Sequence, residues 1–363
     1  MRLLFVGTDR DRAGGAAHFL SMLQAMAAAG HTVEALADRN GFIAERLAQV
    51  GLPWRHARFR NVFAPSAHRA LSRAIRRLEP DWLIGDFGKE YWPLIVQGRL
   101  HGVPVALFRQ RAPAMHRMSE YLLPRLAQRF IAVSEHARAL FVKRGMPAKR
   151  VQVLYNPVDT DVCRPDPAFG RALREELGIP ADAVVVGFVG RMYTGKGIHV
   201  LQQALEPAMQ LEPRLHALWI GEGPQLEDLR RDINAGAHAD RHHLAGWRAD
   251  AGRCYSAMSM LAFPTVMEEM FGRVSIEAQA SGIPVLGSRI GGIAESLIDG
   301  ETGRLLPVGR VEAWRDAIVL LCDDAERARM AEKARAFVEA RFSMPVVAAA
   351  FADLLGGPAD PAA

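Results

Sequence analysis

The sequence predicts an α/β protein of two domains, each built on a parallel β-sheet with helices on both faces. Short apolar runs alternate with helical patterns along most of the 363 residues, which is typical of parallel sheets buried on both faces. The alternation pauses near residues 159–166, where Pro157, Pro165 and Pro167 are typical of a linker, and then starts again. With 50% hydrophobic residues, the chain can build a sizeable core in each domain.

The first half opens with a buried strand at residues 3–6, a loop at 7–15 and an apolar-periodic helix at about 16–29, which Gly30 ends. Six later apolar runs predict further strands, namely residues 32–37, 54–59, 82–84, 103–108, 130–133 and 151–154. Ligands of such sheets bind at the carboxyl ends of the strands. The candidate rim at those ends comprises Gly14, Gly15, residues 86–90, residues 109–111, Ser134 and Asn156.

The second half repeats this pattern. A strand at residues 184–189 leads through a glycine loop at 190–197 into a helix that ends near Met209. The later segments are a helix at 225–233, a helix between Gly272 and Gly282, and strands at 216–220, 243–245, 260–263 and 285–286. We therefore expect two open sheets that face each other across a cleft.

Charge is divided unevenly between the halves. The net charge is +5, but residues 1–160 hold 24 Lys or Arg against 12 Asp or Glu, a balance of +12, and the remainder has a balance of −7. A basic first half favours an anionic partner, such as a phosphorylated glycolipid or an anionic membrane face. The alternative is that these arginines only keep the protein soluble.

The cysteines and the apolar runs indicate where the protein works. Cys163, Cys254 and Cys322 are widely spaced and form no disulfide or metal pattern, which favours a reducing compartment. The N-terminus enters a strand pattern directly, and no apolar run approaches 18 residues. We therefore expect a protein that is neither secreted nor membrane-spanning.

Candidate metal ligands are few. Asp9 with Asp11 and Asp159 with Asp161 form DxD pairs, but such pairs are common and both lie in predicted loops. The histidines and the aspartate within residues 238–243 could chelate, yet we expect a solvated loop there. No metal is expected.

The stretch from residue 263 to 293 contains two carboxylates with a suggestive spacing. Glu269 precedes the predicted helix and Glu277 lies about a turn inside it. Backbone N–H groups of Phe271, Gly272 and the following residues could hold a diphosphate at the helix N-terminus. The carboxylates would repel phosphate, so they are better suited to accept hydrogen bonds from sugar hydroxyls. Alternatively, Glu277 pairs with Arg273 at i,i+4 and Glu269 is a solvated loop residue.

The glycine loop at residues 190–197 reads GRMYTGKG and nearly forms a P-loop. A P-loop requires Ser or Thr after its lysine to hold magnesium, and Gly197 stands there instead. The loop is therefore predicted to cradle a diphosphate without a metal, with Arg191 and Lys196 neutralising it. An ordinary glycine turn with surface cations and a true P-loop NTPase are the alternatives.

Taken together, these motifs resemble the retaining glycosyltransferases of family 4, which have the GT-B fold of two facing Rossmann-like domains. The signature is E-x7-E, here Glu269 to Glu277, followed by GGIAE at 291–295 and DGETG at 299–303. Supporting matches are Gly14 with Gly15, AVSEHAR around Ser134, NPVD at 156–159, the loop at 190–197 and GEGP at 221–224. The matches cover nearly the whole chain, and their ordered set is specific.

The resemblance implies roles for individual residues. Arg191 and Lys196 would hold the donor diphosphate, Glu277 would bind the nucleotide ribose, and Glu269 would meet the hydroxyls of the transferred sugar. Gly15 would let the first domain approach the phosphate. The backbone of Phe271, Gly272, Arg273, Val274 and Ser275 would steady the phosphates, and the segment with Gly246 and Trp247 would border the base.

The resemblance also implies a division of the chain. Residues 1–160 would form the acceptor-binding domain and 161–344 the nucleotide-sugar-binding domain. A C-terminal helix at about 345–358 would cross back to the first domain.

One departure from the family is a missing histidine. Many relatives place one after the fourth strand of the first domain, whereas this chain reads GDFGKE at residues 85–90. Asp86 or Lys89 could replace it, as could Arg109 or His116 from the next loop. Arg109 and Arg111 could instead hold a phosphate or carboxylate on the acceptor, or they could simply be surface residues.

The resemblance thus implies a retaining hexosyltransferase that moves a sugar from a nucleoside diphosphate sugar, in particular a UDP-sugar, to an anionic glycan or glycolipid. Lipopolysaccharide or capsule biosynthesis fits the basic first domain, as does a cytoplasmic enzyme peripheral at the inner membrane surface. Neither nucleic acid nor a cofactor is expected. The alternatives are a UDP-N-acetylglucosamine 2-epimerase-like enzyme of the same fold, a P-loop NTPase, or a nucleotide-sugar-binding protein without activity.

Overall fold

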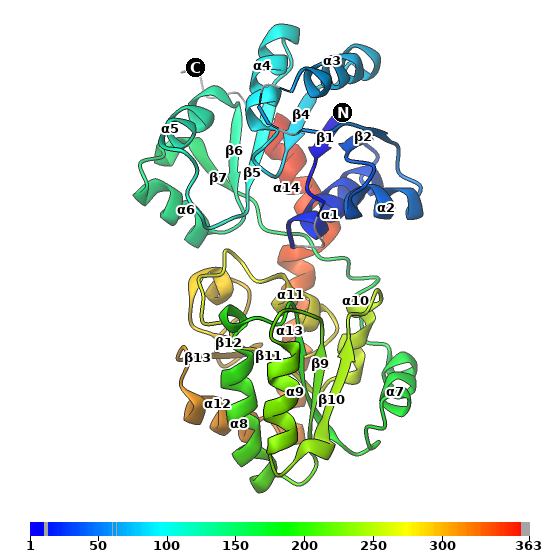
Figure 1. Cartoon of the computed structure of the whole chain (residues 1–363), viewed down its shortest axis with the longest axis vertical. Helices are drawn as coiled ribbons and strands as arrows, with labels where there is room; N and C mark the ends of the chain where they lie inside the picture. The colour runs from blue at the N-terminus through cyan, green and yellow to red at the C-terminus, as the bar shows by residue number, and fades with distance from the viewer. Residues whose placement is uncertain (11–13, 60, 63, 357–363) are drawn as a thin grey trace. The chain divides into compact units, whose positions relative to one another are not determined.

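A computed structural model describes residues 1–10, 14–59, 61–62 and 64–356 (Figure 1). The chain forms two compact units. Unit 1 comprises Met1–Pro157 together with the chain from Met344 onward, and unit 2 comprises Val158–Ser343. The predicted boundaries were 160/161 and 344/345. The predicted last helix, at 345–358, is observed as α14 (Met344–Gly356), and residues 357 and 358 lie outside the described residues.

Unit 1 contains one parallel sheet of seven strands in the order β3-β2-β1-β4-β5-β6-β7. The strands are β1 (Arg2–Gly7), β2 (Thr32–Ala37), β3 (Trp54–His56), β4 (Trp82–Gly85), β5 (Val105–Arg109), β6 (Arg129–Ala132) and β7 (Val151–Val153). The helices of unit 1 besides α14 are α1 (Gly14–Ala28), α2 (Phe42–Gln49), α3 (Pro65–Leu78), α4 (Tyr91–His101), α5 (Arg117–Leu126) and α6 (Glu135–Lys143). Strand β5 starts later than predicted because the Val103 N–H closes α4 by donating to the carbonyl of Gly98 at 2.9 Å.

Unit 2 contains a second parallel sheet, of six strands in the order β10-β9-β8-β11-β12-β13. Its strands are β8 (Val184–Val189), β9 (Leu215–Ile220), β10 (His242–Gly246), β11 (Met260–Phe263), β12 (Val285–Ser288) and β13 (Gly303–Leu306). Its helices are α7 (Pro167–Glu176), α8 (Ile198–Leu211), α9 (Leu226–Ala235), α10 (Ala251–Cys254), α11 (Arg273–Ala280), α12 (Val311–Leu320) and α13 (Asp324–Phe342). The two parallel-sheet units confirm the predicted fold class, whereas β13, α12 and α13 were not predicted.

Local sequence explains where several helices start. Ser134, expected at the rim, is the N-cap of α6, and its hydroxyl accepts the Ala137 N–H at 2.9 Å. Asp166 caps α7 in the same way through the Phe169 N–H at 3.1 Å, with Pro167 as the first helical residue. Both are favoured N-cap residues because a short polar side chain satisfies a free N–H of the first turn.

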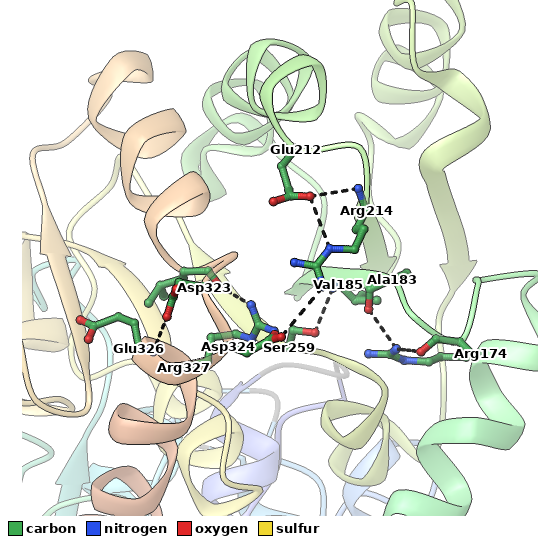
Figure 2. Close-up of polar contacts among 12 residues, drawn as sticks. Arg174, Ala183, Val185, Glu212, Arg214, Ser259, Asp323, Asp324, Glu326 and Arg327 are labelled. Carbon is green, nitrogen blue, oxygen red and sulfur yellow. Dashed lines mark hydrogen bonds and ion pairs between the residues drawn. The ribbon is translucent and has the colours of Figure 1, made fainter.

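Polar contacts tie together the amino edge of the sheet in unit 2 (Figure 2). Val185 and Ser259 are joined by two hydrogen bonds, one through the Ser259 hydroxyl at 3.0 Å and one through its N–H at 2.8 Å. Arg174 on α7 donates to backbone carbonyls of the segment that leads into β8. Arg214 at the start of β9 lies 4.0 Å from Asp324 of α13. The residues of unit 2 with predicted donor roles lie on the side of the opposite, carboxyl edge, whereas Gly15 belongs to unit 1.

Helix α14 completes the core of unit 1. Its residue Phe351 is fully buried, and its ring centroid lies 5.2 Å from that of Phe108 on β5. Arg129 of β6 donates from Nε to the carbonyl of Leu354 at 2.6 Å. The last helix of the chain is therefore an integral part of the unit that holds the first strand.

Replacing Phe351 by alanine should destabilise unit 1 by about 3 to 5 kcal/mol, because it leaves a cavity in a closely packed core. Chemical denaturation measures this change. The matched control is Val346→Ala on the same helix, where the side chain is 39% exposed and a change within about 0.5 kcal/mol is expected. Equal effects of the two substitutions would show that α14 does not contribute to the core as described.

In the part of the chain that the structure describes, no helix has the length and apolar character that crossing a membrane requires.

Candidate active site

The strand order of unit 2 reverses between β8 and β11. Both strands are followed by loops at the carboxyl edge of the sheet, and ligands of open α/β sheets bind at such a switch point. The loop after β8 contains Arg191 and Lys196, and the loop after β11 contains Glu269. The topology therefore brings these three predicted donor residues to one edge.

The two loops touch through glycine backbone. The carbonyl of Gly195 accepts hydrogen bonds from the Val266 N–H at 3.0 Å and from the Thr265 hydroxyl at 2.8 Å. Gly197 has φ +68°, and a Cβ there would lie 1.9 Å from the carbonyl oxygen of Pro264. Only glycine fits this position, which explains why Gly197 stands where a P-loop would carry Ser or Thr.

Lys196 and Glu269 form an ion pair across the two loops. The distance from Lys196 Nζ to Glu269 Oε2 is 2.5 Å, and the side chains are 22% and 25% exposed. Lys196 Nζ also lies 5.5 Å from the centroid of the Phe263 ring. Glu269 is therefore paired and only partly exposed, unlike the solvated loop residue considered in the alternative.

Arg191 is available for a ligand. Its side chain is exposed, and it has no hydrogen-bond or ion-pair partner among the described residues. Since Glu269 neutralises Lys196, Arg191 leaves the glycine loop with an uncompensated positive charge. Such a loop can hold an anion.

A third loop positions the backbone of Glu269. The Gly292 N–H donates to the carbonyl of Glu269 at 2.8 Å. Gly291 has φ +58°, and a Cβ there would lie 2.1 Å from the same carbonyl oxygen. The GGIAE motif thus permits a close backbone approach that holds the backbone of Glu269.

Both carboxylate oxygens of Glu277 are hydrogen-bonded. Arg273 Nη2 lies 3.2 Å from Oε1, which is the i,i+4 pair considered as an alternative. The Tyr255 hydroxyl donates to Oε2 at 2.8 Å. Burial and the nearby carboxylate raise the pKa of the Tyr255 phenol well above its ordinary range, so it remains a donor. Tyr255 was not predicted, because nothing in its local sequence links it to a site 22 residues away.

The N-terminus of α11 lies beside these groups. Its N-cap, Gly272, has φ +97°, and a Cβ there would lie 2.6 Å from the Phe263 ring. No side chain among the described residues caps this helix. Ser275, whose backbone was predicted to steady the phosphates, is fully buried. Its N–H donates to the carbonyl of Gly272 at 3.1 Å and its hydroxyl to the carbonyl of Ser296 at 3.4 Å. Val274 is partly buried beside the core of unit 2.

The predicted base-binding segment lies two strands away from β8. Gly246 ends β10 with φ +66°, and its carbonyl accepts the Gly221 N–H at 2.8 Å. Trp247 follows with 45% of its surface exposed. These residues share the carboxyl edge with the loops after β8 and β11.

Unit 1 carries a buried polar cluster at its own switch point, between β1 and β4. His18 Nδ1 lies 3.0 Å from Asp86 Oδ2 and 2.9 Å from Gln110 Nε2, and Gln110 also donates to Asp86. His18 is 1% exposed, and its Nε2 has no partner among the described residues. Asp86 was a predicted candidate and Gln110 lies within the predicted rim at residues 109–111, whereas His18 was missed. The available signal was a histidine on the buried face of an otherwise apolar helix.

Glu90 is hydrogen-bonded to the backbone of this cluster at Asp86. Its carboxylate accepts the N–H groups of Asp86 at 3.1 Å and Phe87 at 2.6 Å, and the hydroxyl of Thr8 at 3.3 Å. Complete burial raises the pKa of Glu90 from 4.5 to about 7, against the effect of the backbone hydrogen bonds. The folded protein therefore binds a proton there that the unfolded chain has lost by pH 5 to 6.

The pKa of Glu90 predicts that unit 1 loses stability as the pH rises from 4.5 to about 7. In this range the folded state binds more protons than the unfolded state, so the stabilisation present below pH 4.5 is lost, up to about 3 kcal/mol. Glu90→Gln should flatten the dependence, while the exposed Glu45→Gln should leave it unchanged. Denaturant titrations at several pH values provide the measurement, and an unaltered slope in Glu90→Gln would contradict the assignment.

The remaining first-domain candidates lie in different environments. Arg109 is buried, and its guanidinium donates to the carbonyl of Pro113, so it holds its own loop instead of facing the surface. Arg111 pairs with Asp9 at 2.5 Å. Lys89 is exposed, and His116 caps α5. Their role in binding an acceptor stays a prediction.

Gly15 lies in the first turn of α1, which starts two residues earlier than predicted. A Cβ at this position would lie 2.9 Å from the ring of Phe87. Packing between α1 and the loop after β4 is thus sufficient to explain this glycine. The predicted role of Gly15, which is to let the first domain approach the donor phosphate, stays a prediction.

The candidate metal ligands have other partners. Asp11 lies outside the described residues, and Asp159 accepts the N–H groups of Asp161 and Val162 at 3.0 and 3.1 Å. Among the residues described, no three His, Cys, Asp or Glu side chains are grouped to hold a metal.

Two of the candidate histidines lie in β10 and not in a solvated loop as expected. His242 accepts a hydrogen bond from Trp219 at 3.2 Å, and His243 lies 3.1 Å from His216. Burial lowers the pKa of His242 to about 4. These side chains are engaged in packing and hydrogen bonding within unit 2.

Family models match both halves of the chain. The model described as "Glycosyltransferase Family 4" matches residues 12–162, and the model described as "Glycosyl transferases group 1" matches residues 183–324.

Individual relatives extend these matches. The chain is 31% identical over 303 residues to D-inositol 3-phosphate glycosyltransferase 2 of Catenulispora acidiphila, covering 75% of this chain and 68% of that protein. It is 30% identical over 248 residues to lipopolysaccharide 1,2-N-acetylglucosaminetransferase of Salmonella typhimurium, covering 65% and 64%. The chain spans about half the length of several other curated relatives that it matches.

The fold is also found in solved structures. The crystal structure of Anabaena Alr3699/HepE with UDP and glucose superposes with a TM-score of 0.86 at 22% identity, over 98% of this chain and 99% of that one. At this identity the likeness concerns the fold.

Proposed function

Because the chain belongs to the group 1 and family 4 glycosyltransferases, a class of transferase enzymes with the GT-B fold, we propose that it transfers a sugar from a nucleoside diphosphate sugar to an acceptor hydroxyl. The observation that carries this proposal is the site at the switch point of unit 2. There the Lys196–Glu269 ion pair adjoins a loop with an uncompensated arginine. Cations suit a diphosphate, and carboxylates suit sugar hydroxyls.

The leaving diphosphate would be stabilised electrostatically. Arg191 and Lys196 would neutralise the charge that develops as the bond to the sugar breaks, and the uncapped N-terminus of α11 would add its backbone dipole. In the absence of a ligand, Glu269 compensates the charge of Lys196. A bound donor would share Lys196 with the diphosphate, while Glu269 would turn to a sugar hydroxyl. The acceptor oxygen would attack from the face that the diphosphate leaves, with retention of configuration.

Glu277 would bind the ribose hydroxyls of the nucleotide. Arg273 and Tyr255 hold its two oxygens, so the carboxylate is oriented before a ligand arrives. A preoriented acceptor costs less conformational entropy on binding. The base would lie against the segment that contains Gly246 and Trp247.

We further propose a UDP-sugar as donor, since Anabaena HepE is described in complexes with UDP, glucose and UDP-glucose. No metal is required in this scheme, because two side-chain cations face the diphosphate. The acceptor would be an anionic glycan or glycolipid of lipopolysaccharide or capsule biosynthesis. The basic charge of residues 1–160 supports such an acceptor at the cytoplasmic face of the membrane.

A thermal-shift panel with UDP, GDP, ADP, CMP and ATP, each in EDTA and in magnesium, tests the donor proposal. UDP should stabilise the protein in EDTA, and Glu277→Ala should abolish the shift. The control is Glu312→Ala, an exposed carboxylate of α12, which should respond like wild type. Stabilisation only by ATP with magnesium, unchanged in Glu277→Ala, would reject the transferase proposal and favour a P-loop NTPase.

Replacing Tyr255 by phenylalanine should weaken UDP binding about tenfold, because a hydrogen bond to a charged carboxylate is lost. Calorimetric titration in EDTA measures the affinity. Tyr121→Phe, at a tyrosine that is 57% exposed on α5, is the control and should bind UDP normally. Wild-type affinity in Tyr255→Phe would mean that this hydroxyl does not orient Glu277 for the nucleotide.

Arg191→Gln and Lys196→Gln should each lower kcat by roughly 100-fold, since groups that stabilise the departing charge act mainly in the transition state. A release assay for the nucleoside diphosphate, run with the donor that the panel identifies, provides the rate. The control is Arg310→Gln at the exposed start of α12. If kcat stays the same and only KM rises, these cations bind the ground state and the transition state equally and do not selectively stabilise the departing charge.

A further inference from the structure

A groove of about 380 Å³ lies between α3 and α4 of unit 1, which pack side by side (Figure 1). Arg69, Arg73 and Arg76 contribute the basic side of the groove, and Gln97 and Leu100 lie on the side of α4. Together α3 and α4 contain no aspartate or glutamate. The groove therefore concentrates positive charge that neither of its helices neutralises.

The three arginines occupy one face of α3. Their spacing of i, i+4 and i+7 places them in line along a helix. All three are exposed, and none has a hydrogen-bond or ion-pair partner within the described part of the chain. Arg77, on the same helix, instead pairs with Glu34 of β2. Helix α3 thus has one arginine that forms an ion pair within unit 1 and three arginines that are available to bind a ligand.

Hydrogen bonds between the two helices set the width of the groove. Gln97 Nε2 lies 3.3 Å from Nδ1 of His68, whose Nε2 lies 2.9 Å from the carbonyl oxygen of Val62. Ser72 Oγ lies 2.9 Å from Nε2 of His101. The amide, hydroxyl and imidazole groups of the groove are hydrogen-bonded to one another, so the guanidinium groups are the ones left for a ligand.

We propose that this groove binds the phosphate group of an anionic ligand through Arg69, Arg73 and Arg76. Guanidinium donors form a planar fork that matches phosphate oxygens. Like charges at i,i+4 repel one another, and an anion held between them removes that repulsion. The volume suits a phosphate with a small organic group. Leu100 of α4, which is 71% exposed and lines the groove, offers an apolar contact to the rest of the ligand.

This site is separate from the carboxyl edge of the sheet. Helix α4 starts at that edge with Tyr91, whereas Gln97 and His101 lie about 9 to 15 Å further along its axis at 1.5 Å per residue. The groove is therefore an additional anion site and does not depend on the transferase proposal. Its ligand is a phosphoester, either in solution or as the headgroup of a phospholipid.

The test compares the full-length wild-type protein with a groove variant, Arg69→Gln/Arg73→Gln/Arg76→Gln. Titration calorimetry at constant ionic strength uses inorganic phosphate and glycerol 3-phosphate as soluble probes. Co-sedimentation with vesicles of phosphatidylglycerol and phosphatidylcholine, against phosphatidylcholine alone, probes a headgroup. The matched control is Arg39→Gln/Lys143→Gln/Lys149→Gln, which removes the same charge from exposed positions of unit 1 outside the groove.

We expect binding to fall at least tenfold in the groove variant and less than twofold in the control. Saturable binding of glycerol 3-phosphate or inorganic phosphate identifies a soluble phosphoester, and binding to phosphatidylglycerol vesicles alone identifies a headgroup. Equal loss in both variants, or no binding of any probe to wild type, overturns the proposal. UDP-induced stabilisation, measured alongside, should persist in both variants, which shows that they are folded and separates this site from the nucleotide site.

Discussion

Backbone contact between two loops is the constraint on which the site of unit 2 depends. Gly195 and Gly197 allow the loop after β8 to lie directly against Pro264 and its neighbours, where any side chain would clash. This contact brings Lys196 within 2.5 Å of Glu269. Gly291 and Gly292, which follow β12, also permit close backbone contact, and they hold the backbone of Glu269. Four glycines in two motifs therefore set the geometry of a charged pair that they do not themselves form.

In both units, a cation that forms an ion pair lies close in the chain to cations that form none among the described residues. Lys196 is paired while Arg191 in the same loop is not. Arg77 is paired while Arg69, Arg73 and Arg76 on the same helix are not. Exposed ion pairs contribute little stability, so the pairing itself is a weak indicator of importance. Where arginines without partners gather around a groove or a glycine loop, the local field favours anions.

The sequence predicted most of this architecture, because the period of its apolar residues directly reflects buried strands and amphipathic helices. It also predicted that Glu269 precedes a helix and that Glu277 lies inside it, since both residues belong to one short stretch of the chain. The sequence did not reveal the contacts of Tyr255 with Glu277 and of His18 with Asp86, because these contacts join residues far apart in the chain. Arg109 shows the converse error. Its type and position suggested a surface anion site, but its side chain turns inward to bond its own loop.

Helix α14 makes unit 1 discontinuous in the chain, and this has a consequence for the order in which the protein can fold during synthesis. Strands β1–β7 leave the ribosome first, but Phe351 and its neighbours follow only after the whole of Val158–Ser343. At ordinary rates of translation this delay lasts roughly 10 to 40 s. Until α14 has been synthesised, the apolar side of α1 and the ring of Phe108 lack the helix that packs against them in the folded protein. Unit 2 can therefore reach its final packing while unit 1, begun earlier, is still waiting for its last helix.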